Sequence, residues 1–189
     1  MPVWKPIVGK SFAPADFPAY VRSVKFAAWR PQFVVLHNTA APKLSQWHSA
    51  PGEQRMKNFE NFYKNVQKWS AGPHLFVADD LIWVFTPLNT PGVHSPSWNS
   101  ISWGVEMVGD YASEPFGPDG VKRNAVIALA SLYSVLGKDP STLKLHQEDK
   151  LTNHICPGKN VKKADMIARV MKEMTAMNPG DHAPGTLPS

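Results

Sequence analysis

Two histidines and the only cysteine of the chain lie together in the polar segment LHQEDKLTNHICPG, residues 145–158. A further histidine, His37, follows the apolar run FVVL far upstream. Zinc binds thiolate and imidazole ligands, and a catalytic zinc site uses three protein ligands and leaves a fourth position for water. His37, His146 and Cys156 could form such a site if the fold brings them together. A pair of structural histidines beside an incidental thiol would give the same pattern, because a free cysteine most often packs as a small hydrophobic residue.

Both candidate histidine ligands stand where a β-strand is expected to end. The run QFVVLH, residues 32–37, is apolar up to its histidine, which predicts a buried strand that ends at His37. TLKLH, residues 142–146, predicts a short strand that ends at His146. A strand end holds a side chain rigidly at a place where a cleft can form. Cys156 lies ten positions after His146, which is enough for a loop to fold back.

The rest of the chain alternates strands and helices. Apolar residues recur at spacings of three and four between Glu53 and Trp69, which predicts an amphipathic helix. The segment from Val121 to Leu136 predicts a strongly apolar helix that ends at Gly137. The other expected elements are a hairpin in PHLFVADDLIWVFT, a strand in ISWGVEMV and a last amphipathic helix in KKADMIARVMKEMTAM.

This order of elements predicts a single α/β (α+β) domain, with a central mixed sheet of about five to six strands flanked by helices. We expect residues 31–177 to form this domain. Residues 1–30, rich in proline and aromatic residues, predict an arm packed on the domain, with one short helix near residues 16–24. The polar, proline-containing segment at residues 178–189 predicts a flexible tail.

Bulk composition narrows the classes of function. The 189-residue chain has one cysteine, which excludes an intrachain disulfide and therefore a disulfide-dense scaffold. The N-terminus lacks a signal-peptide run and no stretch has the length of a membrane span, so we expect synthesis in the cytoplasm and no membrane insertion. The net charge of +5 favours anionic partners. A basic stripe interleaved with aromatic residues is missing from the sequence, which argues against a nucleic-acid partner. We expect a monomer.

Four motifs follow one another in the chain: FVVLHNTA, PHLFVADDLIWVF, VHSPSWNSISWGVEMVGDY and LHQEDKLTNHICPG. Together they resemble the zinc-dependent N-acetylmuramoyl-L-alanine amidases of the amidase-2 group, which includes phage endolysins and peptidoglycan recognition proteins. The resemblance runs from about Phe33 to Gly158. Each motif alone is weak, whereas the four in this order are fairly specific. The resemblance implies the mixed sheet of that family and one Zn²⁺ ion as cofactor.

The resemblance also implies the three zinc ligands. The first histidine of the family ends a strand and matches His37, and the second matches His146. The third ligand, a cysteine or aspartate before a proline, matches Cys156. Two neutral imidazoles and one thiolate would leave Zn²⁺ with a net positive charge, which helps to acidify a water molecule and to polarise an amide carbonyl.

Two catalytic residues follow from the same resemblance. Glu106, in SWGVEMVG, matches the glutamate associated with the base in one branch of the family. The tyrosine that serves in the other branch has no match, because Pro73 stands at that position. The alternative is that Glu106 is an exposed residue of an alternating strand. His154 stands where many family members have a lysine that stabilises the developing oxyanion; it could donate a hydrogen bond there, or it could itself be a zinc ligand.

The loop TPGVHSPSWNS supplies the candidates for substrate contact. His94 matches a family position that lines the substrate groove, and Trp98 and Asn99 lie in the same loop. Trp98 could stack on a sugar ring or simply pack. His74, at the start of a strand, is expected to brace the sheet or to orient a ligand.

These expectations lead to a peptidoglycan hydrolase that cleaves the amide between the lactyl group of N-acetylmuramic acid and L-alanine of the stem peptide. Its partner would be peptidoglycan or a muropeptide. The expected setting is a bacteriolytic phage or prophage endolysin, made in the cytoplasm and acting on the cell wall or periplasm. The alternatives are a cytoplasmic anhydro-muropeptide recycling amidase, a non-catalytic recognition module and a regulatory protein that binds a polymerase. A zinc nucleobase deaminase does not match, since its glutamate follows its histidine by two positions and its cysteines come in a pair.

Overall fold

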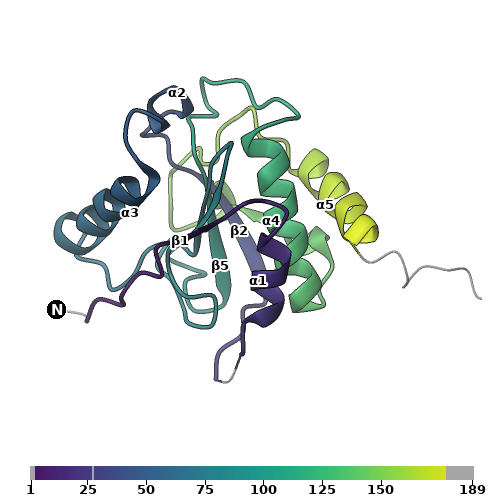
Figure 1. The fold of residues 1–189 in the computed structure, drawn as a ribbon, viewed down its shortest axis with the longest axis horizontal. Helices are drawn as coiled ribbons and strands as arrows, with labels where there is room; N and C mark the ends of the chain where they lie inside the picture. The colour runs from purple at the N-terminus through teal and green to yellow at the C-terminus, as the bar shows by residue number, and fades with distance from the viewer. Residues whose placement is uncertain (1–2, 27, 178–189) are drawn as a thin grey trace, which may run out of the picture.

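The structure, a computed structural model, describes residues 3–26 and 28–177. One six-stranded mixed sheet runs through the molecule, and helices cover both of its faces (Figure 1), which confirms the expected α/β architecture. The strands are β1 (Lys10–Phe12), β2 (Phe33–Asn38), β3 (Leu75–Val77), β4 (Ile82–Val84), β5 (Ser102–Met107) and β6 (Lys144–Leu145). The helices are α1 (Phe17–Ser23), α2 (Leu44–Trp47), α3 (Gly52–Asn61), α4 (Val121–Leu136) and α5 (Lys163–Met177), with a π-helical turn η1 (Phe62–Val66) and 3₁₀ turns η2 (Pro140–Thr142) and η3 (His146–Glu148).

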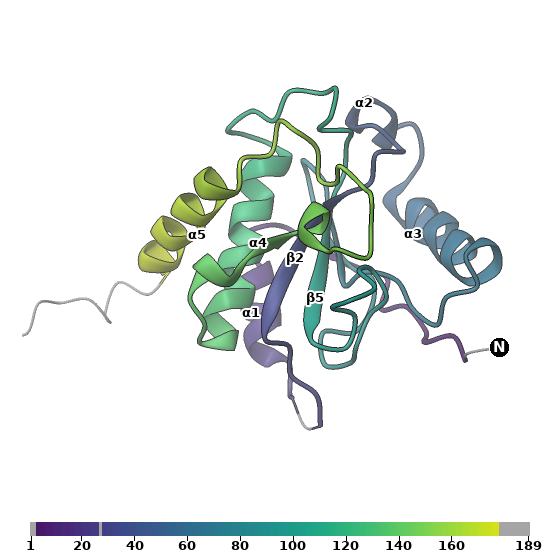
Figure 2. The same ribbon diagram turned by 180° about the vertical axis from the view of Figure 1, so that it is seen from behind.

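Four neighbouring strands run parallel, so their carboxyl ends lie at one edge of the sheet. The strand order is β1-β4-β3-β5-β2-β6. The β1–β4 and β4–β3 pairs are antiparallel, and the β3–β5, β5–β2 and β2–β6 pairs are parallel. The register sets His37 beside Glu106, and His146 follows directly after β6. Figure 2 shows β2 and β5 side by side, with the loop after β6 at the same end. Open sheets of parallel strands form their ligand sites at this edge.

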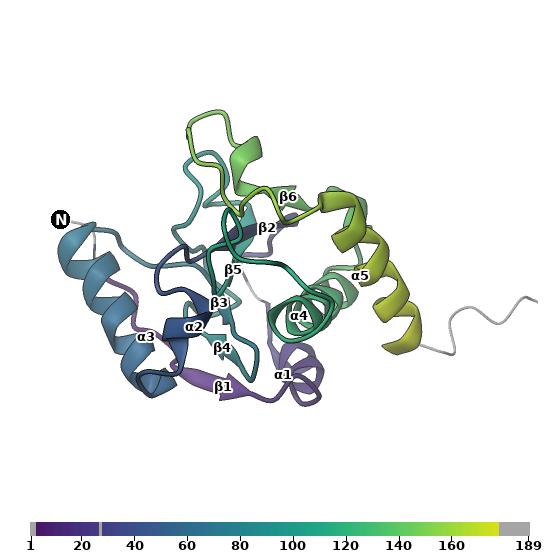
Figure 3. The same cartoon turned by 90° about the horizontal axis from the view of Figure 1, so that it is seen from above.

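Helices α1, α4 and α5 cover one face of the sheet. α4 is buried on nearly all sides because it lies between the sheet and α5, with α1 beside it (Figure 3). It ends at Gly137, whose φ of 62° is the left-handed conformation that glycine adopts without strain, as the sequence predicts. The core of this layer is built from large apolar side chains, among them Phe17, Val34, Trp103, Leu129 and Tyr133.

Helices α2 and α3 cover the opposite face (Figure 3). Trp47 and Met56 pack there with Phe76, Trp83 and Phe85 in a second core. The amphipathic helix expected in this region is present, but its last turn, η1, is π-helical. Turns of this kind appear mostly singly within α-helices and frequently at functional sites. The two cores hold the sheet rigid between them.

The N-terminal segment departs from the sequence expectation in one respect. Lys10–Phe12 pairs with β4 and forms an edge strand of the sheet, which the sequence did not indicate because three residues are too few to show a strand period. The short helix expected nearby is α1. Residues 178–189, expected to be a flexible tail, lie outside the described residues. Within the described part of the chain, no helix is both long and apolar enough to cross a bilayer.

Candidate metal centre and catalytic cleft

Three side chains from distant parts of the chain meet at the carboxyl edge of the sheet. The ligand atoms of His37, His146 and Cys156 all lie within 4.8 Å of one another. His37 comes from the end of β2, His146 opens η3, and Cys156 comes from the loop after η3. All three line a cavity of about 420 Å³. The structure thus brings together the three residues that spacing alone could not place.

Backbone contacts of the loop after η3 position the thiol. The N–H of Gln147 donates to the carbonyl oxygen of Cys156 at 2.8 Å, which closes the loop. The N–H of Asn38 donates to Cys156 Sγ at 3.3 Å, which ties the thiol to the end of β2. Gly158 has a φ of 102°, and a Cβ at this position would lie 2.3 Å from the carbonyl carbon of Tyr111. Only glycine fits there, so Gly158 is required for this close approach of the loop to Tyr111.

The chemistry of this donor set fits a zinc ion. Burial lowers the pKa of His37 well below 6.5 and that of His146 to about 4, with neighbouring imidazoles adding to both shifts, so both rings are neutral and keep a lone pair. Burial raises the pKa of the Cys156 thiol, whereas a coordinating metal deprotonates such a thiol. Among the described residues, His146 Nε2 is buried without a hydrogen-bond partner. Two imidazoles and one thiol are a donor set that zinc prefers.

Glu106 lies beside this centre. Its Oε1 is 3.9 Å from His37 Nδ1, and its side chain is 12% exposed, so it is not a solvated residue on the outside of a strand. Within the described chain, its Oε2 is buried and without a hydrogen-bond partner. Burial raises the pKa of Glu106 to about 8. A carboxyl group with a pKa near neutrality is suited to accepting and returning a proton.

His94 contacts His37 and lines the same cavity. Its Nδ1 is 3.1 Å from His37 Nε2, and its Nε2 is 3.3 Å from the carbonyl oxygen of Ser102. The His94 side chain is 5% exposed. Burial lowers its pKa to about 3, with His74 as the next contribution, so this ring is neutral as well.

His154 lies on the open side of the centre. It is exposed, it lines the cavity, and its ring stacks on that of His146 with centroids 5.4 Å apart. Over the described residues, the cluster of close ligand atoms in this cavity contains His37, His146 and Cys156 but not His154. The geometry therefore favours a role beside the metal for His154 over a role as ligand.

Tyr63 is a cavity residue that the sequence did not reveal. It comes from the π-helical turn η1 and lines the same cavity as Glu106 and Cys156. Its ring stacks on Trp69, with centroids 5.1 Å apart and planes 9° apart. Burial raises the pKa of Tyr63 well above 10, and Glu106 and Cys156 add to the shift, so the phenol keeps its proton. In the sequence Tyr63 belongs to the apolar face of a helix, and its spacing carries no sign of a π turn.

The sequence between residues 28 and 159 matches the family model described as N-acetylmuramoyl-L-alanine amidase. The chain belongs to this amidase family. The match spans the sheet edge and contains every ligand and catalytic candidate, namely His37, Glu106, His146, His154 and Cys156. No curated protein sequence significantly matches the chain.

Solved structures share the fold of this amidase-family chain. Drosophila PGRP-LB superposes with a TM-score of 0.58 at 20% identity, over 88% of this chain and 91% of that one. The endolysin of Thermus scotoductus bacteriophage Ph2119 superposes with a TM-score of 0.60 at 22% identity, over 82% and 96%. The amidase LysC from Clostridium intestinale gives 0.57 at 20% identity, over 79% and 94%. These similarities confirm the fold that the sequence resemblance implied.

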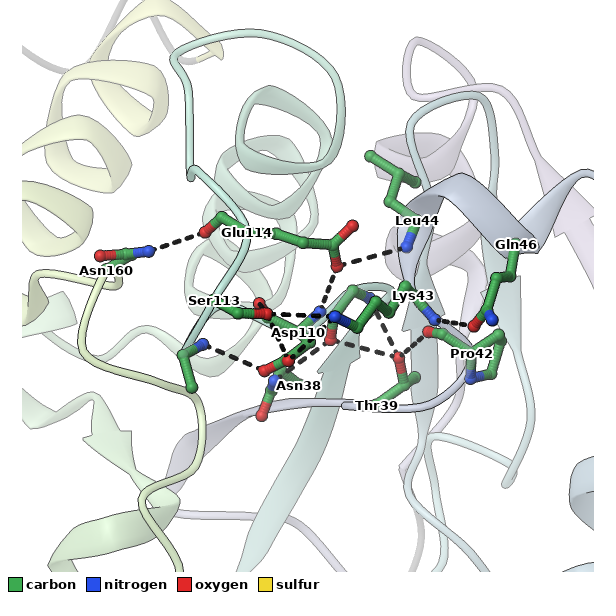
Figure 4. A network of polar contacts seen from close by, with 12 residues as sticks. Asn38, Thr39, Pro42, Lys43, Leu44, Gln46, Asp110, Ser113, Glu114 and Asn160 are labelled. Carbon is green, nitrogen blue, oxygen red and sulfur yellow. Dashed lines mark hydrogen bonds and ion pairs between the residues drawn. The ribbon is translucent and has the colours of Figure 1, made fainter.

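Figure 4 shows a polar network in this amidase-family chain, and two of its members, Thr39 and Asp110, line the cavity. The Thr39 hydroxyl accepts a hydrogen bond from the N–H of Gly109 at 3.0 Å. Lys43 Nζ lies 3.7 Å from Asp110 Oδ2, and the Glu114 carboxylate accepts from the N–H of Asp110 at 2.6 Å. These contacts join the segment after β2 to the segment after β5. They hold together the two strand ends that carry the first ligand and the candidate base.

Asp149 joins two loops beside the cleft, and sequence reasoning missed it. This carboxylate is 1% exposed. It accepts hydrogen bonds from Ser95 Oγ at 2.6 Å, from Ser97 Oγ at 2.5 Å, and from the N–H groups of Ser97 and Leu151 at 3.0 Å each. Asp149 therefore ties the loop that carries His94 to the loop that carries two of the three ligands. We name this set of contacts the Asp149 latch.

Asn99 and Trp98, the other two candidates in the loop that carries His94, contact different parts of the structure. Asn99 Oδ1 accepts from the backbone N–H groups of His94 and Ser95 at 2.7 and 2.8 Å, and so shapes the loop. Asn99 also lines a smaller cavity of about 240 Å³ that borders the larger one. Trp98 packs edge-on against Phe33, with centroids 5.8 Å apart. Substrate contact by His94, Trp98 and Asn99 stays a prediction.

Proposed function

We propose that this chain is a zinc-dependent N-acetylmuramoyl-L-alanine amidase. It would hydrolyse the amide between the lactyl group of N-acetylmuramic acid and the L-alanine of the stem peptide. The observation that carries the proposal is the meeting of His37, His146 and Cys156 within 4.8 Å, with Glu106 beside them in one cavity. A non-catalytic recognition module needs neither a thiol ligand nor a buried carboxyl at this place.

In the proposed reaction, His37, His146 and Cys156 would hold a zinc ion, which when bound would supply the Lewis-acid chemistry that acidifies a water molecule and polarises the scissile carbonyl. Glu106 accepts a proton from that water and passes it to the leaving nitrogen of L-alanine. The water oxygen adds to the carbonyl carbon and the carbon–nitrogen bond breaks, so the lactyl group ends as a carboxylate and the L-alanine of the peptide ends as a free amine. His154, on the open side of the cleft, donates a hydrogen bond to the developing oxyanion.

For the biological setting we propose an endolysin that reaches the cell wall or periplasm after synthesis in the cytoplasm. The net charge of +5 supports approach to anionic wall polymers. The fold also occurs in the endolysin of bacteriophage Ph2119 and in a PGRP-LB variant that was solved in complex with tracheal cytotoxin. A muropeptide is accordingly the proposed substrate class, and a recycling amidase that takes soluble anhydro-muropeptides is the second candidate.

The test incubates the full-length chain with purified sacculi and, separately, with soluble anhydro-muropeptides. Mass spectrometry of the products should find stem peptides with a free L-alanine amine and glycan with an intact lactyl carboxylate. The matched control is Cys156→Ala, which should release neither. Cleavage of sacculi supports the endolysin, whereas cleavage of soluble muropeptides alone supports the recycling enzyme. Binding without products from either substrate would contradict the proposed activity.

A further inference from the structure

The inference concerns His94, the buried imidazole in contact with His37. His94 touches the first ligand through Nδ1, which is 3.1 Å from His37 Nε2, and touches the backbone of β5 through Nε2, which is 3.3 Å from the carbonyl oxygen of Ser102. Both ring nitrogens are therefore engaged, and the side chain is 5% exposed. A ring held in this way has little freedom to follow a substrate.

The directions of these hydrogen bonds follow from the partners. A carbonyl oxygen can only accept, so His94 Nε2 must carry the hydrogen that points at Ser102. The Ser102 hydroxyl lies 3.5 Å from the same nitrogen, but it donates its hydrogen to the carbonyl oxygen of Trp98 at 2.7 Å. A neutral imidazole has one donor and one acceptor. His94 Nδ1 is therefore the acceptor, and His37 Nε2 donates to it.

This direction settles which nitrogen of His37 remains free of hydrogen. With its hydrogen on Nε2, His37 keeps a lone pair on Nδ1. Nδ1 is also the atom that lies 3.9 Å from the Glu106 carboxylate, and Glu106 lines the cavity. The nitrogen left with a lone pair thus faces the place where a metal and the candidate base would meet.

We propose that His94 is a positioning residue of the metal centre. By accepting the hydrogen of His37 Nε2, it fixes the tautomer and the orientation that present Nδ1 of His37 to zinc. The proposal rests on the zinc centre of the proposed function and gives His94 a role toward the ligand, where the sequence suggested contact with substrate. Residues that orient a ligating histidine typically contribute about 10- to 100-fold in metal affinity or activity.

The surroundings of His94 are built to hold this ring. A Cβ on Gly104 would lie 2.4 Å from His94 Cγ, so β5 carries a glycine where the ring packs against the strand. On its other side lies His74, with ring centroids 5.8 Å apart. His74 itself is fixed, because its Nδ1 accepts from the N–H of Gly104 at 3.0 Å and its Nε2 lies 3.0 Å from the carbonyl oxygen of Thr90. His74 braces the sheet as expected and keeps His94 in register with His37.

The first experiment measures zinc affinity by competition with a chromophoric chelator. His94→Leu removes the acceptor, and its zinc dissociation constant should rise about 10- to 100-fold. His94→Asn keeps an acceptor oxygen near the position of Nδ1 and should recover most of the affinity. The matched control is Asn124→Leu, which removes a buried polar side chain that bonds to the carbonyl oxygen of Ala78 and does not line the cavity; its affinity should stay within about threefold of wild type. Cobalt-substituted protein adds a signature, since the His94→Leu ligand-field bands should shift and the Asn124→Leu bands should not.

The second experiment needs no variant. Nitrogen-15 spectra of the zinc-loaded wild-type chain should place a hydrogen on His37 Nε2 and a scalar coupling between that nitrogen and His94 Nδ1. A hydrogen on His37 Nδ1 would overturn the proposal, as would a folded His94→Leu variant with wild-type zinc affinity. If the wild-type chain binds no zinc, the result contradicts both the proposed metal centre and the positioning role of His94. If the wild-type chain binds zinc but cleaves no muropeptide, the proposed activity is wrong. The positioning role of His94 is then still tested by the zinc affinities of wild type and the variants.

Discussion

Glu106 owes its proposed role to its surroundings. Its carboxyl lies in an apolar strand environment, 12% exposed, where burial raises its pKa to about 8. Such a group costs free energy to keep buried, because one of its oxygens finds no partner among the described residues. The arrangement is understandable if this carboxyl exchanges a proton with the reacting water. Glu106 is therefore the residue whose replacement should separate catalysis from metal binding.

We expect Glu106→Gln to lower kcat by about two to four powers of ten, the usual contribution of a general base. The amide cannot accept a proton, which explains the fall in kcat. It keeps the shape of the carboxyl, and Glu106 is not one of the three candidate ligands, so the zinc content should stay near one per chain. Glu53→Gln, on the exposed surface of α3, is the matched control and should keep full activity. Turnover and metal content are measured on the same preparations. If Glu106→Gln kept more than about a third of the wild-type rate, another group would have to be the base.

His154 allows a sharper separation of roles. If it donates to the oxyanion, His154→Ala should keep its zinc and lose about 10²- to 10³-fold in kcat, as expected for one lost donor. His154→Lys should recover much of the rate, because an ammonium is also a donor. If His154 is a ligand, the alanine variant should lose zinc and thermal stability together, and lysine should rescue neither. An alanine variant that is fully loaded and fully active would rule out both roles.

At the scale of elements, sequence reasoning succeeded where a local pattern fixes a position. The apolar runs before His37 and His146 predicted the two strand ends to within one residue, and the strand ISWGVEMV placed Glu106 correctly. Each of these patterns is contained within one element. The parallel register that sets His37 beside Glu106 depends on strand order, which the spacing of residues does not encode.

Tyr63 and Asp149, which the sequence did not indicate, act through contacts between elements. Tyr63 enters the cavity through a π turn, and no periodicity distinguishes that turn from the α-helix before it. Asp149 joins two loops about fifty residues apart, so its role exists only in the folded chain. Polar residues in loops are common, and nothing in the segment QEDKLTN separates a buried carboxylate from exposed ones.

The Asp149 latch predicts a stability that depends on pH. Burial alone would raise the pKa of Asp149, but hydrogen bonds from Ser95, from Ser97 and from the N–H of Leu151 outweigh it and lower the pKa. A carboxyl with a lowered pKa contributes stability that is fully present above its unfolded pKa of about 3.9 and is lost as the pH falls. We therefore expect the stability conferred by Asp149 to be complete at neutral pH and to decline in acid.

The test compares Asp149→Asn with wild type. The amide turns a donor group toward two of the donors that the carboxylate satisfied, and unsatisfied buried donors cost about 1–3 kcal/mol each. With two such donors, the free energy of unfolding at pH 7 should fall by about 2–6 kcal/mol, and the difference from wild type should shrink below about pH 4. Asp119→Asn, an exposed aspartate before α4, is the control and should change the stability little. Urea titrations across pH measure both, and a difference independent of pH would contradict the latch.

At the scale of the whole molecule, the candidate metal centre joins segments that only folding brings together. His37 belongs to β2, His146 follows β6, and Cys156 ends a loop that is fastened to the end of β2. An unfolded chain scatters these ligands and binds zinc weakly. Zinc binding should consequently stabilise the entire fold, since a ligand that binds the native state alone shifts the unfolding equilibrium.

We expect zinc removal to lower the melting temperature of the wild-type chain. Zinc at about 100 times its dissociation constant contributes about 2.7 kcal/mol. In a chain of 189 residues, each kcal/mol corresponds to about 2–4 °C, so the shift should be roughly 5–11 °C. The shift should grow with the logarithm of the free zinc concentration, and magnesium, which prefers oxygen ligands, should not replace zinc. His37→Ala removes one ligand and should melt at nearly the same temperature with and without zinc. A wild-type melting temperature that ignores zinc, in protein shown to be folded, would mean that the three side chains meet without forming a metal site.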